Sequence, residues 1–178
     1  MPPRFKIMIK KYVVGLMFNK LMSDVVLIRK QKPAWQVGML NGVGGKVNEG
    51  EHEREAMIRE FEEETGVHYE DWKKFAVVTD KETFRVAFYA ASDYESFKNV
   101  HTTEAETIVK SNIRGCGDIG FCIDGSAVYN LNWLIPLALD EKIVFPVEFT
   151  HLPNGPSFGN GNFLNPDNGV KTNPEVSD

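Results

Sequence analysis

GKVNEGEHEREAMIREFEEETGV, residues 45–67, is the stretch of this 178-residue chain with the strongest structural signal. Its part from 52 to 65 has neither Gly nor Pro and is rich in Glu, Arg, Ala, Met and Phe, a composition that favours helix. Gly66 follows at the position where helices commonly end. We therefore predict a helix over residues 52–65 that stops at Gly66.

Three carboxylates of this helix, on Glu60, Glu63 and Glu64, are spaced three and four residues apart or adjacent, so they are expected to converge on one side. Like charges at this spacing repel each other, and a bound cation would offset that repulsion. Hard oxygen ligands suit Mg²⁺ or Mn²⁺, which in turn suit phosphate substrates. The alternative is an acidic helix face in contact with solvent and without any ligand.

Charge is unevenly distributed along the chain. Residues 49–64 hold eight Glu and two Arg, a net charge of −6, whereas residues 1–48 hold nine Lys and Arg and one Asp; the whole chain carries −5. This arrangement is unlike one broad basic face, and we expect no nucleic-acid partner. No apolar run approaches the roughly 18 residues that a membrane helix needs. The charged start MPPRFKIMIKK is unlike a secretory signal and predicts a cytoplasmic protein.

Outward from the acidic helix, the chain alternates between β-rich stretches and one further apolar helix. We predict strands over 5–18, 25–30, 73–82, 83–92, 107–113 and 143–149, a helix over 131–141, and a loop over 31–48. The order indicates an α/β domain with a mixed sheet between helices, spanning residues 1–152. Residues 153–178 are dominated by Asn, Gly and Pro, so we expect an irregular or disordered tail.

The spacing within the acidic segment carries a family resemblance. It reads Gly45, five residues, Glu51, seven residues, Arg59-Glu60-Phe61, one residue, Glu63-Glu64, one residue, Gly66-Val67. This pattern resembles the signature of the Nudix hydrolases at every defined position, a match expected by chance on the order of 10⁻⁹ per starting point. The resemblance implies a Nudix-type α/β/α sandwich. It also implies metal-dependent hydrolysis of a pyrophosphate bond in a nucleoside diphosphate derivative.

By this resemblance, Glu60 and Glu64 are the main ligands of Mg²⁺, with Mn²⁺ as the other possible ion. Gly44 supplies a carbonyl ligand, Glu63 is an auxiliary ligand, and Glu64 or Glu60 is the general base. Arg59 can hold a carboxylate in a bidentate grip and set its orientation. Many relatives keep a further carboxylate, as a metal ligand or a general base, at the place of Glu104 or Glu106. The sequence leaves the choice between these two open, and a solvated loop without any such role is the alternative for either.

Two flanking runs, RKQKPAWQVGMLNGVGGK (29–46) and NLNWLIPLALD (130–140), resemble the Nudix subgroup that cleaves purine nucleoside triphosphates, including oxidised ones. Asn41 stands where that subgroup contacts the base. Tyr129 and Asn130 stand where its oxidised-guanine enzymes carry two Asp, so oxidised-guanine specificity is not implied. Candidate contacts to the substrate are Asn41, Arg29, Lys46, Asn130 and Trp133, with Lys30 and Lys32 as further phosphate contacts. Trp35 and Trp133 are candidates for stacking on the base, with core packing as the alternative for each.

Taken together, the sequence predicts an enzyme that converts a purine (d)NTP into (d)NMP and pyrophosphate. ADP-ribose or a dinucleoside polyphosphate is the alternative substrate, and a Nudix-like module that binds a nucleotide without cleaving it is the alternative outside the enzyme class. The expected partner is the nucleotide itself, and the protein is expected to be a monomer or a homodimer.

Overall fold

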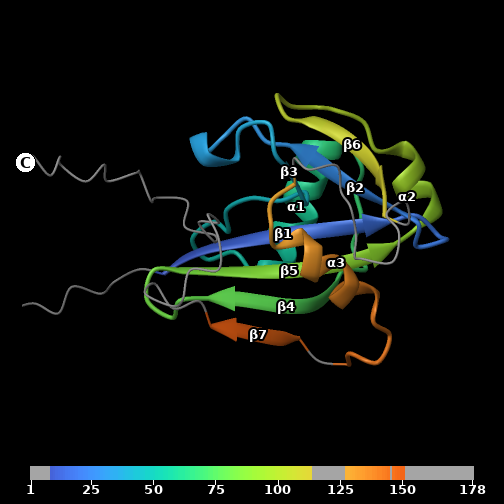
Figure 1. Cartoon of the computed structure of the whole chain (residues 1–178). Helices are drawn as coiled ribbons and strands as arrows, with labels where there is room; N and C mark the ends of the chain where they lie inside the picture. Colours follow the sequence, from blue (N-terminus) through green and yellow to red (C-terminus); the bar gives the residue numbers. More distant parts are fainter. Residues whose placement is uncertain (1–8, 114–126, 145, 151–178) are drawn as a thin grey trace, which may run out of the picture.

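The computed structural model describes residues 9–113, 127–144 and 146–150. In these residues a mixed β-sheet lies between helices (Figure 1). The strands are β1 (Lys10–Phe18), β2 (Asp24–Arg29), β3 (Leu40–Asn41), β4 (Lys73–Thr79), β5 (Phe84–Ser92), β6 (Thr107–Asn112) and β7 (Val147–Thr150). The helices are α1 (Glu53–Thr65), α2 (Tyr94–Asn99) and α3 (Leu131–Leu139), with a 3-10 turn at Ala34–Gln36.

The described strands form one sheet in the order β3-β2-β1-β5-β4-β7, and β6 pairs with β2. β1 and β5 run parallel over nine residue pairs, from Lys10 opposite Phe84 to Phe18 opposite Ser92. β4 is antiparallel to β5 and parallel to β7, while β2 is antiparallel to β1, β3 and β6. The predicted mixed sheet is confirmed.

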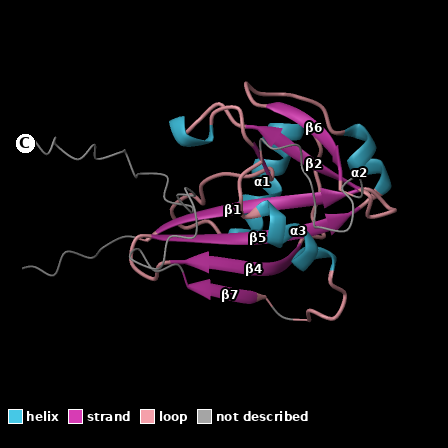
Figure 2. Cartoon of the chain, viewed as in Figure 1, coloured by secondary structure: helices cyan, strands magenta, loops and turns pink. Residues whose placement is uncertain are grey.

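Alternation along β1 builds two cores, one on each side of the sheet. Val13 and Met17 pack with the residues of α1, whereas Leu16 and Phe18 pack with those of α3. Figure 2 shows α3 on the near side of the sheet and α1 on the far side. The α/β/α layering expected of the fold is therefore present. None of the helices in the described ranges has the length and apolar character that a bilayer crossing needs.

Helix α1 is held against the sheet by apolar side chains on its inner face. Met57 and Phe61 are fully buried, and the ring of Phe61 meets that of Trp72 edge-on at 5.0 Å between centroids. Gly66 ends the helix in the left-handed conformation (φ 71°), with its N–H donating to the carbonyl of Glu62. The predicted helix is confirmed, with its first residue one position later.

Several element boundaries differ from the predicted ones. The predicted loop 31–48 contains the 3-10 turn and β3, and α2 was not predicted, although Asp93 accepts a hydrogen bond from the N–H of Ser96 as helix-capping residues do. The last strand starts at Val147 rather than 143, and α3 ends at Leu139 rather than 141. Pro136 lies inside α3. Residues 5–8 and the predicted tail fall outside the described residues.

Candidate active site

The segment that precedes α1 is tied to β1, which brings two adjacent glycines in front of the helix. The N–H of Gly15 donates to the carbonyl of Val43 (2.7 Å), and the N–H of Val13 donates to that of Gly45 (2.9 Å). A Cβ atom at Gly45 would overlap the carboxylate of Glu60. A Cβ atom at Gly44 would overlap the backbone carbonyl of Val13, and this residue has a φ of +153°, so the position beside the helix requires glycine.

Glu64, in the last turn of α1, is a buried carboxylate with 8% exposure. The N–H of Gly44 donates to its Oε2 at 3.0 Å. Burial raises the pKa of Glu64 to about 8, and the nearby charges of Glu106 and Glu60 push the pKa in the same direction, while Lys30 opposes them. The ionised form of this carboxylate is therefore unfavourable unless further positive charge lies nearby.

Arg59 forms hydrogen bonds with three carboxylates of the segment, those of Glu51, Glu60 and Glu63. Its Nε and Nη2 bind the two oxygens of Glu51 at 2.8 and 3.0 Å, a bidentate pair. Its Nη1 reaches Oε1 of Glu60 at 2.8 Å and Oε2 of Glu63 at 3.0 Å. Nη2 also donates to the carbonyl of Lys46. Arg59 thus contacts three carboxylates at once, and its role in orienting them stays a prediction.

The two predicted ligands nearest Arg59 differ in burial. The side chain of Glu60 is 15% exposed and that of Glu63 is 50% exposed. Burial raises the pKa of Glu60, and the hydrogen bond and charge of Arg59 oppose that rise. Glu60 and Glu64 face Gly45 and Gly44, respectively, whereas Glu63 extends toward solvent.

A second ion pair joins the end of β2 to the start of β6. The ammonium of Lys30 lies 2.7 Å from Oε2 of Glu106, and the N–H of Gln31 donates to Oε1 at 3.0 Å. Glu106 is buried, whereas Glu104 is exposed. Of these two residues, Glu106 is therefore the one that lies beside Glu64, where its charge acts on that carboxyl.

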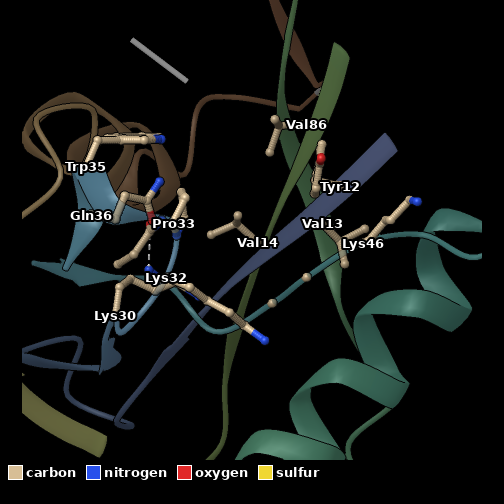
Figure 3. Close-up of a pocket in the computed structure, with 14 residues that line it drawn as sticks. Tyr12, Val13, Val14, Lys30, Lys32, Pro33, Trp35, Gln36, Lys46 and Val86 are labelled. Atoms are coloured by element: carbon tan, nitrogen blue, oxygen red, sulfur yellow. Dashed lines mark hydrogen bonds between the residues drawn. The ribbon is translucent and has the colours of Figure 1, made fainter. Parts of the chain in front are cut away.

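A cavity of about 210 Å³ opens next to the glycines, on the side of the sheet that α3 covers (Figure 3). Its wall is mainly apolar and contains three lysines and two amides. The lining residues are Tyr12, Val13, Val14, Lys30, Lys32, Pro33, Trp35, Gln36, Asn41, Gly42, Gly44, Gly45, Lys46 and Val86. Figure 3 shows Trp35 and Pro33 on one side of the cavity and Lys46 on the other, near α1.

The polar groups of the cavity are only partly satisfied. Asn41 accepts a hydrogen bond from the N–H of Gly42 (2.8 Å), and its amide nitrogen has a long 3.4 Å contact with Oε1 of Gln36. The indole Nε1 of Trp35 is buried and has no partner among the described residues. An apolar cavity with a few converging polar groups is the usual form of a small-molecule site.

Three predicted substrate contacts lie away from this lining. The guanidinium of Arg29 donates to the carbonyl of Gly38 at 2.7 Å. Trp133 packs on Phe149 with 4.7 Å between ring centroids, a core contact. Asn130 is 1% exposed, and neither polar atom of its amide has a partner in the described part of the chain.

Comparison with known proteins shows which family the chain belongs to. A model described as NUDIX domain matches residues 8–111, more than half of the chain. The chain belongs to the Nudix family. The match spans β1 to β6 and includes α1, so α3, with Asn130 and Trp133, lies outside it.

Solved structures of Nudix proteins share the fold at low identity. A MutT NUDIX hydrolase from Burkholderia pseudomallei is 20% identical, with a TM-score of 0.51 over 60% of this chain and 84% of that one. A MutT/nudix family protein from Enterococcus faecalis is 18% identical, with a TM-score of 0.53 over 66% of this chain and 48% of that one. A search of the curated proteins finds no match.

Family membership establishes the coarse chemistry. The protein is a Nudix hydrolase that acts on a pyrophosphate bond of a nucleotide derivative, and Nudix hydrolases generally use divalent metal ions. Within the described ranges, no three His, Cys, Asp or Glu side chains stand as a ready ligand group. Instead, Arg59 forms ion pairs with Glu60 and Glu63, and Lys30 forms one with Glu106. The donor chemistry nonetheless fits a hard cation, because the carboxylates of Glu60 and Glu64 are screened from water beside backbone that only glycine allows.

Sequence reasoning did not single out several residues of this Nudix site. Tyr12, Val14 and Val86 line the cavity from β1 and β5, and Gln36 lines it from the 3-10 turn. These strand residues look like ordinary core residues, and only the pairing of β1 with β5 brings them to one place. Trp35 was considered as a stacking residue, with core packing as its alternative, and it does line the cavity.

Proposed function

We propose that this Nudix hydrolase converts a purine (d)NTP into (d)NMP and pyrophosphate in the presence of Mg²⁺, with Mn²⁺ as a substitute. One observation carries the proposal: the partly buried carboxylate of Glu60 and the buried carboxylate of Glu64 face Gly45 and Gly44 at the edge of an apolar cavity that three lysines also line. Carboxylates for a cation, lysines for phosphates and an apolar cavity for a base thus meet in one region.

The metal would be held by Glu60, Glu64 and the carbonyl of Gly44, with Glu63 and Glu106 as auxiliary ligands. When bound, it supplies neutralisation of the diphosphate charge and a water of lowered pKa. Arg59 keeps Glu60 in place through the 2.8 Å contact to Oε1. Because Glu64 has no ion-pair partner among the described residues, we favour Glu64 over Glu60 as the group that takes a proton from the attacking water.

The cavity would take the base and its sugar. Trp35 and Pro33 offer apolar surface for a purine ring, and the amide of Asn41 offers a donor and an acceptor to its edge. Lys30, Lys32 and Lys46 line the same cavity and suit the phosphates, and Arg29, at the end of β2, is a further candidate.

Asn130 is the strongest candidate for reading the base among residues outside the lining. It occupies the N-cap position of α3, where Asn usually caps the helix, but its side chain makes no cap hydrogen bond. The N–H of Val128 donates to the carbonyl of Leu40, which places the start of α3 next to Asn41. A buried amide whose two polar atoms find no partner in the described part of the chain can accept one from a ligand, and the edge of a purine would provide it.

A substrate panel tests the proposal. Purified protein is incubated with Mg²⁺ or Mn²⁺ and with purine and pyrimidine (d)NTPs, ADP-ribose and dinucleoside polyphosphates, and the products are separated and quantified. We expect the purine (d)NTPs to be turned over fastest, with pyrophosphate rather than phosphate as product. Faster turnover of ADP-ribose than of every NTP would overturn the substrate assignment, and nucleotide binding without any turnover would favour a sensing module.

A further inference from the structure

Two cations hold the carboxylates of the site, and they differ in what surrounds them. Arg59 binds Glu51, Glu60 and Glu63 on the solvent side of α1. Lys30 binds Glu106 on the cavity side, and its side chain is only 13% exposed. Lys30 is thus a partly buried cation that both contacts a site carboxylate and lines the cavity.

We propose that Lys30 is an exchangeable counter-ion: it occupies the carboxylate site while the metal is absent, and it turns to the substrate phosphates when the metal enters. This inference rests on the proposed function, since it assumes that Glu60, Glu64 and Glu106 surround the metal.

The charges around Lys30 explain why it must move. Its ammonium lies 2.7 Å from Glu106, and it also acts electrostatically on Glu64, so it neutralises part of the charge that a divalent ion would neutralise. Two cations in the same partly buried site repel each other strongly, because the surrounding dielectric constant is low. A lysine has a flexible four-carbon stem and a compact charge, which allows it to leave without any movement of the backbone.

The local structure keeps the carboxylate in position during this exchange. The backbone N–H of Gln31 donates to Oε1 of Glu106, the oxygen that Lys30 does not bind. Glu106 therefore stays tied to the loop after β2 when the ammonium departs. The departing ammonium remains on the cavity wall, close to Lys32 and Lys46, where phosphate oxygens would accept its hydrogen bonds.

The test compares Mn²⁺ binding and metal-free stability in four proteins: wild type, Lys30→Met, Lys32→Met and Glu64→Gln. Mn²⁺ affinity is measured by calorimetry or by electron paramagnetic resonance without nucleotide, and thermal unfolding is followed with EDTA and with saturating Mn²⁺. Lys32 is the matched control, because it lines the same cavity but forms no ion pair among the described residues.

We expect Lys30→Met to bind Mn²⁺ about tenfold more tightly than wild type, because no resident cation has to be displaced. We also expect it to unfold several degrees lower in EDTA, because Glu106 loses its ion-pair partner and Glu64 loses a nearby positive charge, while Mn²⁺ raises its Tm more than that of wild type. The KM for a purine NTP should rise, since a phosphate contact is lost. Lys32→Met should match wild type in both metal affinity and EDTA stability.

Unchanged or weaker Mn²⁺ binding by Lys30→Met would overturn the exchange, as would an equal gain in Lys32→Met. Glu64→Gln separates this failure from failure of the proposed function. If Glu64→Gln binds Mn²⁺ as tightly as wild type, the metal site itself is wrong. If Glu64→Gln loses binding and Lys30→Met gains none, only the exchange is wrong.

Discussion

The two ends of helix α1 use the same residue type in opposite ways. At its first turn, Glu53 accepts hydrogen bonds from Lys74 (2.6 Å) and Arg85 (2.8 Å), so both oxygens are paired with cations from β4 and β5. At its last turn, Glu64 is more deeply buried, and among the described residues its carboxylate accepts a hydrogen bond from the neutral N–H of Gly44 rather than from a cation.

The pKa values follow this difference. Burial pushes the pKa of Glu53 up, but hydrogen bonds from Lys74 and Arg85 outweigh it, and the net pKa lies below its ordinary value of 4.5. Burial raises the pKa of Glu64 to about 8, and Lys30 offsets this only in part. A carboxylate with built-in counter-ions stabilises the fold, whereas one without them is a place where an external cation can bind.

The largest effect is expected for Glu64→Gln, which removes the carboxylate at the last turn of α1. We expect kcat for the nucleotide substrate to fall by about 10³-fold or more, because a ligand and the favoured base are lost together, whereas Glu53→Gln should stay within about threefold of wild type. Steady-state kinetics with saturating Mg²⁺ measure both. Equal losses in the two variants would contradict the assignment.

Thermal unfolding in EDTA shows whether Glu64→Gln is folded. Because the pKa of Glu64 in the fold is about 8, above its ordinary value of 4.5, the folded protein loses stability as the pH rises from 4.5 to about 8, and the loss is complete above that pH. Glutamine carries no charge and avoids this loss. At pH 8.5 without metal, we therefore expect the Gln variant to be at least as stable as wild type.

Arg59→Lys tests the part of the site that lies between the two ends of α1, because it weakens the hydrogen bonds to Glu51 and Glu60. Lysine cannot reproduce the bidentate contact with Glu51 while it also reaches Glu60, so we expect kcat/KM to fall by about 10- to 100-fold. The Tm should fall by only a few degrees, because the lost pairs are partly exposed. A variant with wild-type kcat/KM would show that Arg59 serves the fold alone.

Asn130→Leu tests whether a buried neutral group without a partner among the described residues serves substrate binding rather than stability, as we propose for Glu64. We expect KM for a purine NTP to rise about tenfold, while the free energy of unfolding stays equal or increases, because the change removes two buried polar atoms that have no partner among the described residues. A matched Asn41→Leu variant loses a group that already has partners and should be less stable. Loss of stability without a change in KM would make Asn130 a structural residue.

The smallest expected effect is that of Glu53→Gln on stability. At pH 7 it should lower the free energy of unfolding by about 1–2 kcal/mol. Because the pKa of Glu53 is lowered in the fold, its contribution is complete above pH 4.5 and is lost as the pH falls through the folded value. Urea titrations at pH 7 and pH 3 measure this. A difference that persists unchanged at pH 3 would mean that the charge is not its cause.

Local sequence determined much of this protein. The Gly-free and Pro-free run before Gly66 specifies α1, because helix propensity and a glycine stop act within a few residues of each other. The β-rich stretches specify most strands, and the spacing from Gly45 to Val67 identifies the family that the domain match confirms. The sequence did not predict β3 or α2, because elements of two to six residues carry little periodic signal.

Only the tertiary structure decided which carboxylates have counter-ions. Glu53 and Glu64 belong to one acidic run, yet the groups that stabilise their charges come from residues 20 to 34 positions away in the chain: Lys74 and Arg85 for Glu53, Gly44 and Lys30 for Glu64. The same holds for the choice of Glu106 over Glu104 as the carboxylate beside the site, and for the cavity that β1, β5 and the segment after β2 form together. The physical reason is that burial and charge pairing depend on contacts between strands, which no local stretch of sequence encodes.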